Sequence, residues 1–298
     1  MIVIVDSNLV GYKSKYTQGF LSHGDKRTGV IFGFLDTVLK ISYLFNTNNL
    51  VFAWDSRKSN REYLYYSEYK KGAREKIKKE ATKEEKREMR YAHEQFRELR
   101  LYTLPKLGFK NVFMQVGYEA DDIMASVAEF STEKVVIYSD DHDMLQCLNG
   151  HVEIYMPRSK KIVTQNDIIK EKDILPHIYG MVLAISGCRT DNVPSVTTVG
   201  KGTKVGEKTA IKYLNNKLPV DSAQYQLIIS KKGSKFIARN AFLTCLPFEG
   251  TKVFELQKNN FSAKKFRNIF SEYGFKSFLK QETWLKWMRQ FCQDDIPF

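Results

Sequence analysis

Short apolar runs alternate along this chain with segments whose apolar positions recur at helical spacing. Four apolar runs predict buried strands, at residues 1–5, 49–55, 111–116 and 134–141. Helical spacing predicts helices over 29–46 and 119–130, and helical patterns dominate from about residue 166. Residues 151–165 predict a short hairpin. Strands that alternate with helices predict an α/β fold with a mainly parallel central sheet flanked by helices.

The predicted elements fall into two parts. Residues 1–165 form an α/β core, and residues 166–298 form a mainly helical region packed on it. Within the core, residues 75–104 are rich in Glu, Lys and Arg and contain few helix breakers, so they predict a long exposed helix. The chain has no repeats and no low-complexity tracts.

Acidic residues gather where the predicted strands end. Asp6, Asp55 and Asp141 each close an apolar run. Ligands of open α/β sheets bind outside the carboxyl ends of the strands, so these acids are expected at one edge of the sheet. Glu119 and Asp122 are spaced to share a helix face. Asp143 points the same way as Asp141 if that stretch is extended.

The full candidate set is Asp6, Asp55, Glu119, Asp121, Asp122, Asp141, Asp143 and Asp191. Converging carboxylates repel and raise one another's pKa, and a divalent cation relieves that repulsion. Oxygen ligands suit Mg²⁺ or Mn²⁺. Two such ions about 4 Å apart would cleave a phosphodiester by activating water and stabilising the leaving oxygen. The alternative for any single acid is helix capping or solvation, which is our interpretation of Asp140.

The charge distribution favours a nucleic-acid partner. The formal net charge is +13 and the isoelectric point is about 9.4. Residues 57–100 hold 15 basic against 9 acidic side chains, and residues 157–240 hold 15 against 6. The remainder is slightly acidic. Separate basic surfaces and an acidic centre are what a nuclease needs to hold phosphate and metal.

The four cysteines are widely spaced and form no CxxC pair, which fits a reducing cytosol better than a disulfide framework. The first residues lack the basic and apolar regions of a signal peptide, and no apolar stretch approaches the length of a membrane span.

Taken in order, the motifs resemble the flap-endonuclease or 5′-nuclease family of phages and bacteria. The matching stretches are IVDSNL at Asp6, FAWDSRKSNREYLYYSEYKKGAR after Asp55, GYEADD, SDDHDMLQ, DNVPSV and VGEKTA. The resemblance runs over residues 1–215 and continues weakly to about 280. Each motif alone is weak, but their order is specific.

This resemblance implies a PIN-like nuclease core with a helical arch at about 57–104 and a helix-hairpin-helix-type DNA-binding region. It implies a Mg²⁺-dependent 5′→3′ exonuclease and flap endonuclease, with RNase H action on primers in replication. The eight acids would be metal ligands, directly or through water. The compact length without a polymerase domain resembles phage members, whose site of action is the host cytosol.

A basic, aromatic segment follows the second predicted strand. The resemblance places a phosphate-contacting Lys and Arg there. Lys71 with Arg74 matches the family spacing, and Lys70 stays open because it follows the tyrosine as the family motif also requires. Tyr can stack on a base while Lys and Arg neutralise phosphates. Other expected nucleic-acid contacts in this segment are Arg57, Lys58, Arg61 and Tyr69. The alternative is a solvated amphipathic helix.

A glycine-rich stretch at 199–210 predicts a second phosphate contact. Glycines let a loop bring backbone N–H groups to phosphate, and the lysines add charge. Its candidate residues are Lys201, Gly202, Lys204, Gly206, Lys208 and Thr209. It is not a Walker A loop, because Glu207 stands where the second glycine belongs. It resembles the family hairpin that grips duplex DNA and can hold K⁺, although it is about six residues longer. A flexible turn is the alternative.

One departure from the family pattern concerns the metal ligands. The pattern G-D-x-x-D-N reads here Gly187-Cys188-Arg189-Thr190-Asp191-Asn192. Thiol is a poor partner for Mg²⁺. The second ion would then bind more weakly, bind through water or recruit another acid; a small buried residue is the alternative for Cys188. Lost activity would leave a DNA-junction-binding replication accessory protein on the same fold.

The sequence also bears on another enzyme class and on a role for the C-terminal tail. A PIN-type single-strand RNase is disfavoured by the basic helix and the C-terminal region. The tail at 293–298 is acidic and then apolar, as in tails that dock on replication proteins, although an untethered terminus is the favoured interpretation. We expect a monomer that binds branched or 5′-ended DNA and RNA–DNA hybrids and no membrane.

Overall fold

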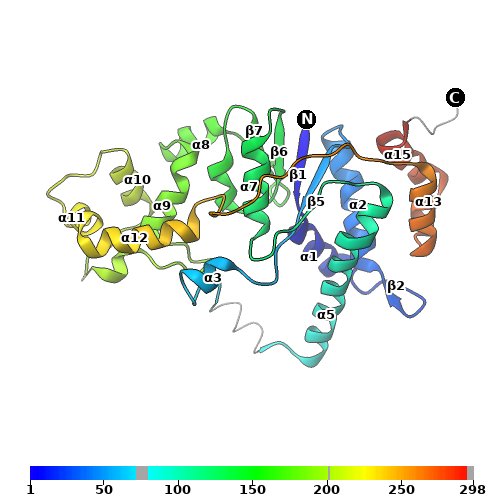
Figure 1. The fold of residues 1–298 in the computed structure, drawn as a ribbon, viewed down its shortest axis with the longest axis horizontal. Coiled ribbons are helices and arrows are strands. Elements are labelled where there is room, and N and C mark those ends of the chain that lie inside the picture. Colours follow the sequence, from blue (N-terminus) through cyan, green and yellow to red (C-terminus); the bar gives the residue numbers. More distant parts are fainter. Residues whose placement is uncertain (72–79, 201, 294–298) are drawn as a thin grey trace.

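The computed structural model describes residues 1–71, 80–200 and 202–293. A six-stranded sheet lies at the centre, with helices on both faces (Figure 1). In sheet order the strands are β5 (Val112–Phe113), β4 (Leu50–Ala53), β1 (Ile2–Asp6), β6 (Val135–Tyr138), β7 (Val152–Met156) and β8 (Lys161–Val163). The first five are parallel, and β8 runs antiparallel to β7. The predicted mainly parallel sheet and the hairpin are confirmed.

The central strand β1 explains why the apolar runs are continuous. Val3 is in register with Leu50 of β4, and Ile2 with Val135 of β6. Val3 contributes to the core on one face of the sheet and Ile2 to the core on the other. A strand buried on both faces must be apolar at every position, so its sequence does not alternate with polar residues.

One face of the sheet is covered by helices from both ends of the chain. They are α1 (Ser7–Gln18), α2 (Gly29–Leu44), α5 (Lys83–Glu98), α13 (Ala263–Glu272), α14 (Lys276–Leu279) and α15 (Gln281–Phe291). Phe34 of α2, Phe266 of α13 and Trp287 of α15 lie in this one core. The last three helices therefore lie far from the other C-terminal helices (Figure 1). The division of the chain at residues 165 and 166 stays a prediction.

The other face carries two helices that connect strands of the sheet and the helices that follow the sheet along the chain. They are α7 (Ala120–Phe130), η2 (His142–Cys147), α8 (Gln165–Lys172), η3 (Pro176–Ile178), α9 (Tyr179–Ser186), η4 (Val196–Val199), α10 (Glu207–Leu214), α11 (Ala223–Ile229) and α12 (Lys231–Thr244). The segment 245–262, which has no helix or strand, runs back along the sheet to α13 (Figure 1). Asn111 holds it by accepting from the backbone of Gln257 and donating back to it.

The predicted long helix over 75–104 is only partly correct. Residues 72–79 lie outside the described part of the chain, and α5 begins at Lys83. Thr82 caps it in a capping box with Glu85, and this cap fixes the start. The helix continues through a π-helical turn, η1 (Leu99–Thr103), into α6 (Leu104–Leu107).

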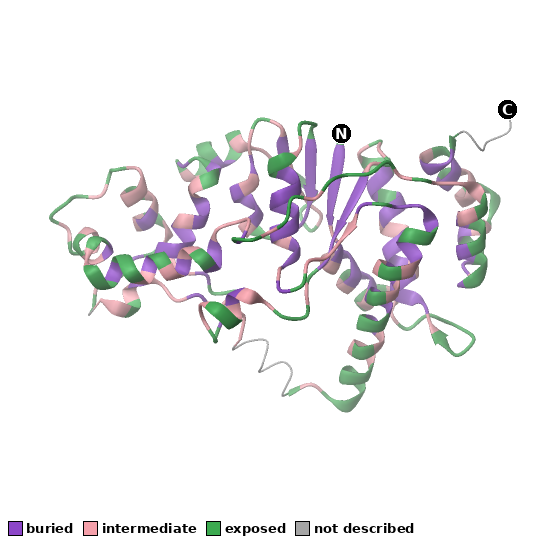
Figure 2. Ribbon diagram, viewed as in Figure 1, coloured by how far each residue is buried: buried purple, intermediate pink, exposed green. Residues whose placement is uncertain are grey.

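The prediction that this helix is exposed is wrong for its second half. Ala92, Phe96 and Leu99 recur at helical spacing and are buried in the core, while the first turns of α5 are exposed (Figure 2). A short helix, α3 (Asn60–Leu64), precedes this segment, and a small hairpin of β2 (Ser22–His23) and β3 (Lys26–Arg27) joins α1 to α2. Within the described ranges no helix is both long and apolar enough to cross a bilayer.

Candidate metal centre and nucleic-acid interface

The carboxyl ends of β1, β4 and β6 bring three acids to one edge of the sheet. Asp6 accepts hydrogen bonds from the backbone N–H of Leu9, at 2.9 Å, and from the hydroxyl of Ser139, at 3.1 Å. Asp55 accepts from the backbone N–H of Ala120 at 2.8 Å and so ties β4 to the start of α7. Asp6 and Asp55 therefore accept from helix N-termini, as the helix-capping alternative predicted. These hydrogen bonds also fix the orientation of the two carboxylates.

Electrostatic interactions link these acids with Asp121 and Asp141. Burial raises the pKa of Asp6 to about 7, and the charges of Asp55 and Asp141 add to the rise. Burial also raises the pKa of Asp121 well above its usual range, with further rises from Asp141, Asp6 and Asp55. Asp141 in turn accepts from the backbone N–H of Asp143 at 2.8 Å. We call Asp6, Asp55, Asp121 and Asp141 the first acidic group.

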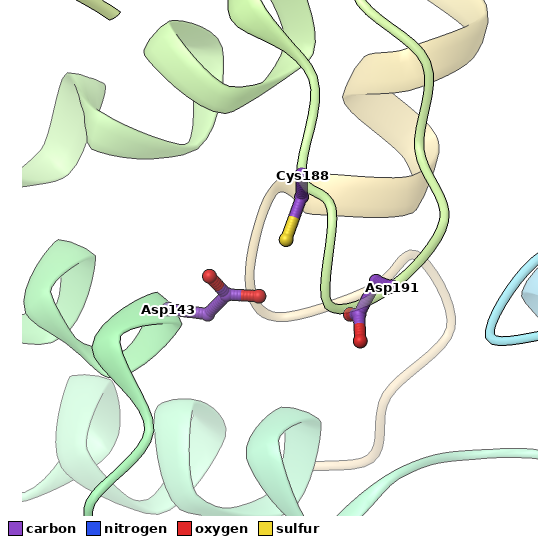
Figure 3. Close-up of side chains that lie close together, drawn as sticks. All are labelled: Asp143, Cys188 and Asp191. Atoms are coloured by element: carbon purple, nitrogen blue, oxygen red, sulfur yellow. The ribbon is translucent and has the colours of Figure 1, made fainter. Parts of the chain in front are cut away.

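A second group consists of Asp143, Cys188 and Asp191 (Figure 3). Their carboxylate and thiol ligand atoms all lie within 4.8 Å of one another. Burial raises the pKa of Asp143 to about 7, and Asp141 and Asp191 contribute to that rise. Burial also raises the pKa of Asp191 and of the Cys188 thiol. The departure at position 188 therefore places sulfur between two carboxylates, not in a remote part of the core.

Lys70 lies beside two of the candidate acids. Its Nζ lies 2.7 Å from a carboxylate oxygen of Glu119 and 3.6 Å from one of Asp191. The hydroxyl of Tyr69 donates to the same two side chains at 3.1 Å each. Burial raises the pKa of Glu119, but Lys70 and then Arg61 outweigh it, so the pKa is lowered overall. The pKa of Glu119 is thus lowered, whereas those of Asp121, Asp143 and Asp191 stay raised although Lys70 acts on them too.

The backbone places Lys70 in that position. Its φ of +55° is left-handed, and its N–H donates to the carbonyl of Asp191 at 2.8 Å. The neighbouring Lys71 instead pairs with Glu62 at 3.1 Å. The structure therefore places Lys70, the residue left open by the spacing, against Glu119 and Asp191, and pairs Lys71 with Glu62. Arg74 lies outside the described residues.

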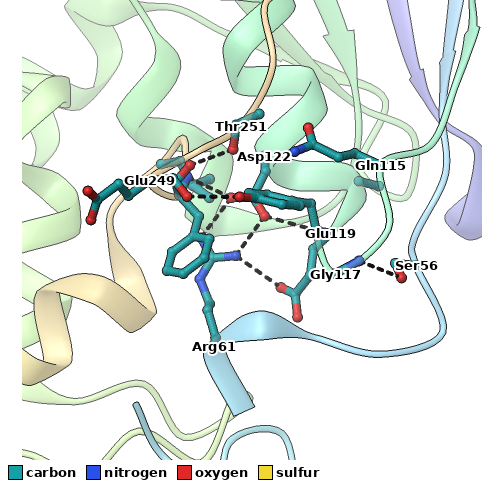
Figure 4. Close-up of polar contacts among 12 residues, drawn as sticks. Ser56, Arg61, Gln115, Gly117, Glu119, Asp122, Glu249 and Thr251 are labelled. Carbon is teal, nitrogen blue, oxygen red and sulfur yellow. Dashed lines mark hydrogen bonds and ion pairs between the residues drawn. The ribbon is translucent and has the colours of Figure 1, made fainter. Parts of the chain in front are cut away.

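Two of the predicted site residues form a buried structural ion pair instead (Figure 4). Both terminal nitrogens of Arg61 donate to the carboxylate of Asp122 at 2.7 Å. Asp122 also accepts from the backbone N–H groups of Glu119 and Phe248. Both of its oxygens are engaged, so the prediction of Asp122 as a metal ligand is wrong. The prediction of Arg61 as a nucleic-acid contact is also wrong, because only 2% of the residue is exposed.

Tyr69 also departs from its predicted role. It is 3% exposed, and its ring packs with Cys188, Val193 and Leu243. A buried ring offers no face to a nucleic-acid base, so the prediction of a stacking residue is wrong. Its hydroxyl positions the acids instead. The basic residues around Tyr69 in the sequence give no indication whether its ring is buried or exposed.

The other candidate nucleic-acid contacts lie on the surface. Arg57 and Lys58 are exposed beside α3, and Lys204 and Lys208 are exposed near the start of α10. The exposed Gly202 has φ +77°, which favours glycine. Gly206 precedes α10 as its N-cap, and Thr209 is half-buried in the first turn. Lys201 lies outside the described part of the chain.

A groove of about 660 Å³ lies beside Cys188 and this loop. Cys188 and Asn192 line it together with Lys204 and Gly206. Ser195 holds the loop by donating to the carbonyl of Val205 at 2.9 Å. The glycine-rich loop and the 188–193 turn therefore line one groove.

Two supporting residues were missed by the sequence reasoning. Ser139 donates to Asp6 and accepts from the backbone N–H of Asp141, so it links two strand ends. Asn8 accepts from the backbone N–H of Asp55 at 3.0 Å. Asn8 lies in the IVDSNL motif and Ser139 in the SDDHDMLQ motif. Their positions close to the candidate acids in sequence are the signal from which they could have been predicted.

Comparison with known proteins settles the family. Residues 1–174 match the 5′-3′ exonuclease N-terminal, resolvase-like domain. The chain belongs to the 5′-3′ exonuclease family of nucleases. It is 30% identical over 215 residues to a 5′-3′ exonuclease of Buchnera aphidicola subsp. Schizaphis graminum, covering 70% of this chain and 68% of that protein. It is 29% identical over 208 residues to one of Aquifex aeolicus, covering 68% and 67%.

Solved structures share the fold of this nuclease. The 5′-exonuclease of T5 with zinc ions bound superposes with a TM-score of 0.66 at 20% identity. A complex of the bacteriophage T5 flap endonuclease with DNA and metal ions gives the same TM-score and identity. Each comparison covers 83% of this chain and 89% of the other. The PIN-like 5′-nuclease architecture predicted from the sequence is confirmed.

Proposed function

We propose that this family member is a Mg²⁺- or Mn²⁺-dependent, structure-selective 5′-nuclease, acting as 5′→3′ exonuclease and flap endonuclease on branched or 5′-ended DNA. The observation that carries the proposal is the meeting of acids from β1, β4, α7, η2 and the 188–193 loop at one edge of the sheet. A module that only bound DNA would gain nothing from negative charge massed beside phosphate.

The donor atoms fit divalent cations. Burial raises the pKa values of Asp6, Asp121 and Asp143, and neighbouring carboxylates add to each rise, so a bound divalent cation would stabilise the ionised forms. The oxygen-only first acidic group suits Mg²⁺ or Mn²⁺. Asp143 and Asp191 would hold a second ion. When bound, such ions supply an activated water and stabilise the leaving oxygen of the phosphodiester.

The remaining residues would position the substrate. Lys70 stands where its charge can stabilise a phosphate that approaches the acids. Glu119 and Tyr69 hold Lys70 and Asp191 in place. The exposed lysines Lys204 and Lys208 lie where the backbone of a duplex would be neutralised as it enters the groove.

We extend this proposal to the substrate range, the cellular process and the partners. We propose action on RNA–DNA hybrids as well as DNA, in replication or repair, by a monomer in the cytosol of a bacterium or of a phage-infected host. We also retain K⁺ at the 199–206 loop and a replication partner for the C-terminal tail. Residues 294–298 of that tail lie outside the described residues.

A panel of labelled substrates tests this function. A 5′-flap, a nick, an RNA-primed duplex and a blunt end are incubated with Mg²⁺, Mn²⁺ or EDTA. We expect cleavage near the flap junction with either metal and none in EDTA. If flap DNA is bound tightly but not cut with either metal, the nuclease proposal fails. Cys188 is the observation that favours the competing function, a junction-binding accessory protein, and that result would support it.

A further inference from the structure

Cys188 occupies a ligand position in the second acidic group. Its sulfur lies within 4.8 Å of carboxylate oxygens of both Asp143 and Asp191, and all three side chains point into one space (Figure 3). The backbone fixes this position, because Cys188 and Val193 exchange both N–H to carbonyl hydrogen bonds, at 2.9 and 2.7 Å. Asp191 lies in the turn that this pair closes.

The surroundings of the sulfur distinguish a ligand from a packing residue. Part of Cys188 packs beside Tyr69 and Leu243, as a small apolar residue would. Its Sγ, however, is 2.9 Å from the hydroxyl of Thr190 and faces two carboxylates. The charges of Asp143 and Asp191 repel each other, and a cation bound by all three side chains would relieve that repulsion. The arrangement is a mixed sulfur and oxygen donor set, which differs from the oxygen-only first group.

We infer that the second site prefers a softer divalent cation than Mg²⁺, such as Co²⁺, Zn²⁺ or Cd²⁺, bound by Cys188, Asp143 and Asp191. Thiolate selects soft metals, whereas carboxylate and water suit Mg²⁺. Zinc–sulfur and zinc–oxygen bonds of about 2.3 and 2.1 Å place ligand atoms roughly 3.5 Å apart in a tetrahedron. The ligand atoms of the present cluster lie within 4.8 Å of one another, so binding would draw them closer. The thiol proton passes to solvent as the sulfur–metal bond forms.

This inference rests on the proposed function for the presence of a second ion. It adds that the two ions of this chain need not be the same element. The first group would keep Mg²⁺ or Mn²⁺, while the second would discriminate against Mg²⁺.

Titration of the full chain with Co²⁺ tests the inference without any cleavage assay. Thiolate bound to Co²⁺ gives a near-ultraviolet charge-transfer absorption that carboxylate does not give. We expect this band in the wild type, saturating at one equivalent, and its loss in Cys188→Ser and Cys188→Asp. Cys292→Ser is the matched control, because Cys292 is equally buried but lies in the core on the other face of the sheet. It should keep the band.

A competition measurement by calorimetry completes the test. We expect Cys188→Asp to bind Cd²⁺ at the second site at least tenfold more weakly, and Mg²⁺ more tightly, than the wild type. A band that persists in Cys188→Ser, or wild-type protein that binds two Co²⁺ ions without the band, would overturn the inference. Flap cleavage is scored separately in Mg²⁺ alone and in Mg²⁺ with Co²⁺: protein that shows the band but cuts in neither condition contradicts only the nuclease proposal, and protein that cuts in Mg²⁺ but shows no band contradicts only the metal preference.

Discussion

Lys70 and Lys71 are adjacent in sequence but have different electrostatic surroundings. Lys70 contacts Glu119 and approaches Asp191, whereas Lys71 pairs with Glu62 on the surface. A cation at the reacting phosphate stabilises charge that develops in the transition state. We expect Lys70→Met to lower the single-turnover cleavage rate by about 10²–10³-fold. Lys71→Met should change it by less than about tenfold.

Rapid-quench cleavage of a 5′-flap in saturating Mg²⁺ measures both rates, and melting curves verify that each variant is folded. A larger loss of cleavage rate in Lys71→Met than in Lys70→Met would contradict this expectation. It would favour Lys71 as the phosphate-contacting lysine, as the family spacing predicted.

Asp143 makes the stability of the metal-free protein depend on pH. Burial, with Asp141 and Asp191, raises its pKa from 3.8 to about 7. Between these values the folded state holds a proton that the unfolded state has released, so the free energy of unfolding falls as pH rises from about 4 to about 7. Asp143→Asn removes the buried charge. In EDTA it should melt above the wild type at pH 8, by ~2–4 °C per kcal/mol recovered, and by a smaller margin at pH 5.

Calorimetric melting in EDTA at both pH values makes this comparison. Added Mg²⁺ should raise the melting temperature of the wild type at pH 8 more than that of Asp143→Asn. An Asp143→Asn protein that melts below the wild type at pH 8 in EDTA would show that the charge of Asp143 does not destabilise the folded state.

The sequence indicated the acids correctly but not which of them the protein neutralises. Asp122 and Asp121 are neighbours in one motif, yet Asp122 binds Arg61 and Asp121 belongs to the first acidic group. Their difference depends on the direction of each side chain from α7 and on the fold of a segment some 60 residues away. Neither the charge pattern nor the spacing contains that information.

At the scale of elements, α3 is anchored to α7 through the Arg61–Asp122 pair. Removing one partner of a buried ion pair leaves an uncompensated charge and costs about 3–5 kcal/mol. We expect Arg61→Met to lower the free energy of unfolding by that amount, measured by urea denaturation. The exposed Arg57→Ala should change it by less than about 0.5 kcal/mol.

The double variant Arg61→Met/Asp122→Leu should recover part of the loss, because no buried charge is then left unpaired. Equal, small effects of Arg61→Met and Arg57→Ala would mean that Arg61 is solvated, as the sequence suggested.

The strands could be predicted because burial on both faces leaves an unbroken apolar run, as in β1 and β4. The helix over 75–104 could not be placed fully. Its charge is concentrated on one face, while Ala92, Phe96 and Leu99 pack inward. The return of α13 to α15 onto the core beside α2 is a long-range contact. Local periodicity shows that such helices are amphipathic but not which face of the sheet they cover.

At the scale of the whole molecule, the parallel sheet brings residues that are distant in sequence to one edge. β1, β4 and β6 all end at the same edge, and the 188–193 loop closes it from the helical side. The basic segment beside α3 and the loop before α10 lie on the surface around this centre. Carboxylates inside and cations outside are the arrangement on which the proposed chemistry depends.

Asp141→Ala offers the most direct test of that arrangement, with Asp140→Ala as its matched control. Asp141 belongs to the first acidic group, while Asp140, its neighbour, accepts from the backbone N–H of Arg158 at 3.0 Å. The measurement is single-turnover cleavage of a 5′-flap duplex in Mg²⁺. Loss of several kcal/mol of metal-derived stabilisation predicts a rate on the order of 10²–10³-fold lower for Asp141→Ala and no cleavage in EDTA. Asp140→Ala should stay within about tenfold of the wild type, and cleavage by Asp141→Ala at the wild-type rate would contradict the metal centre described above.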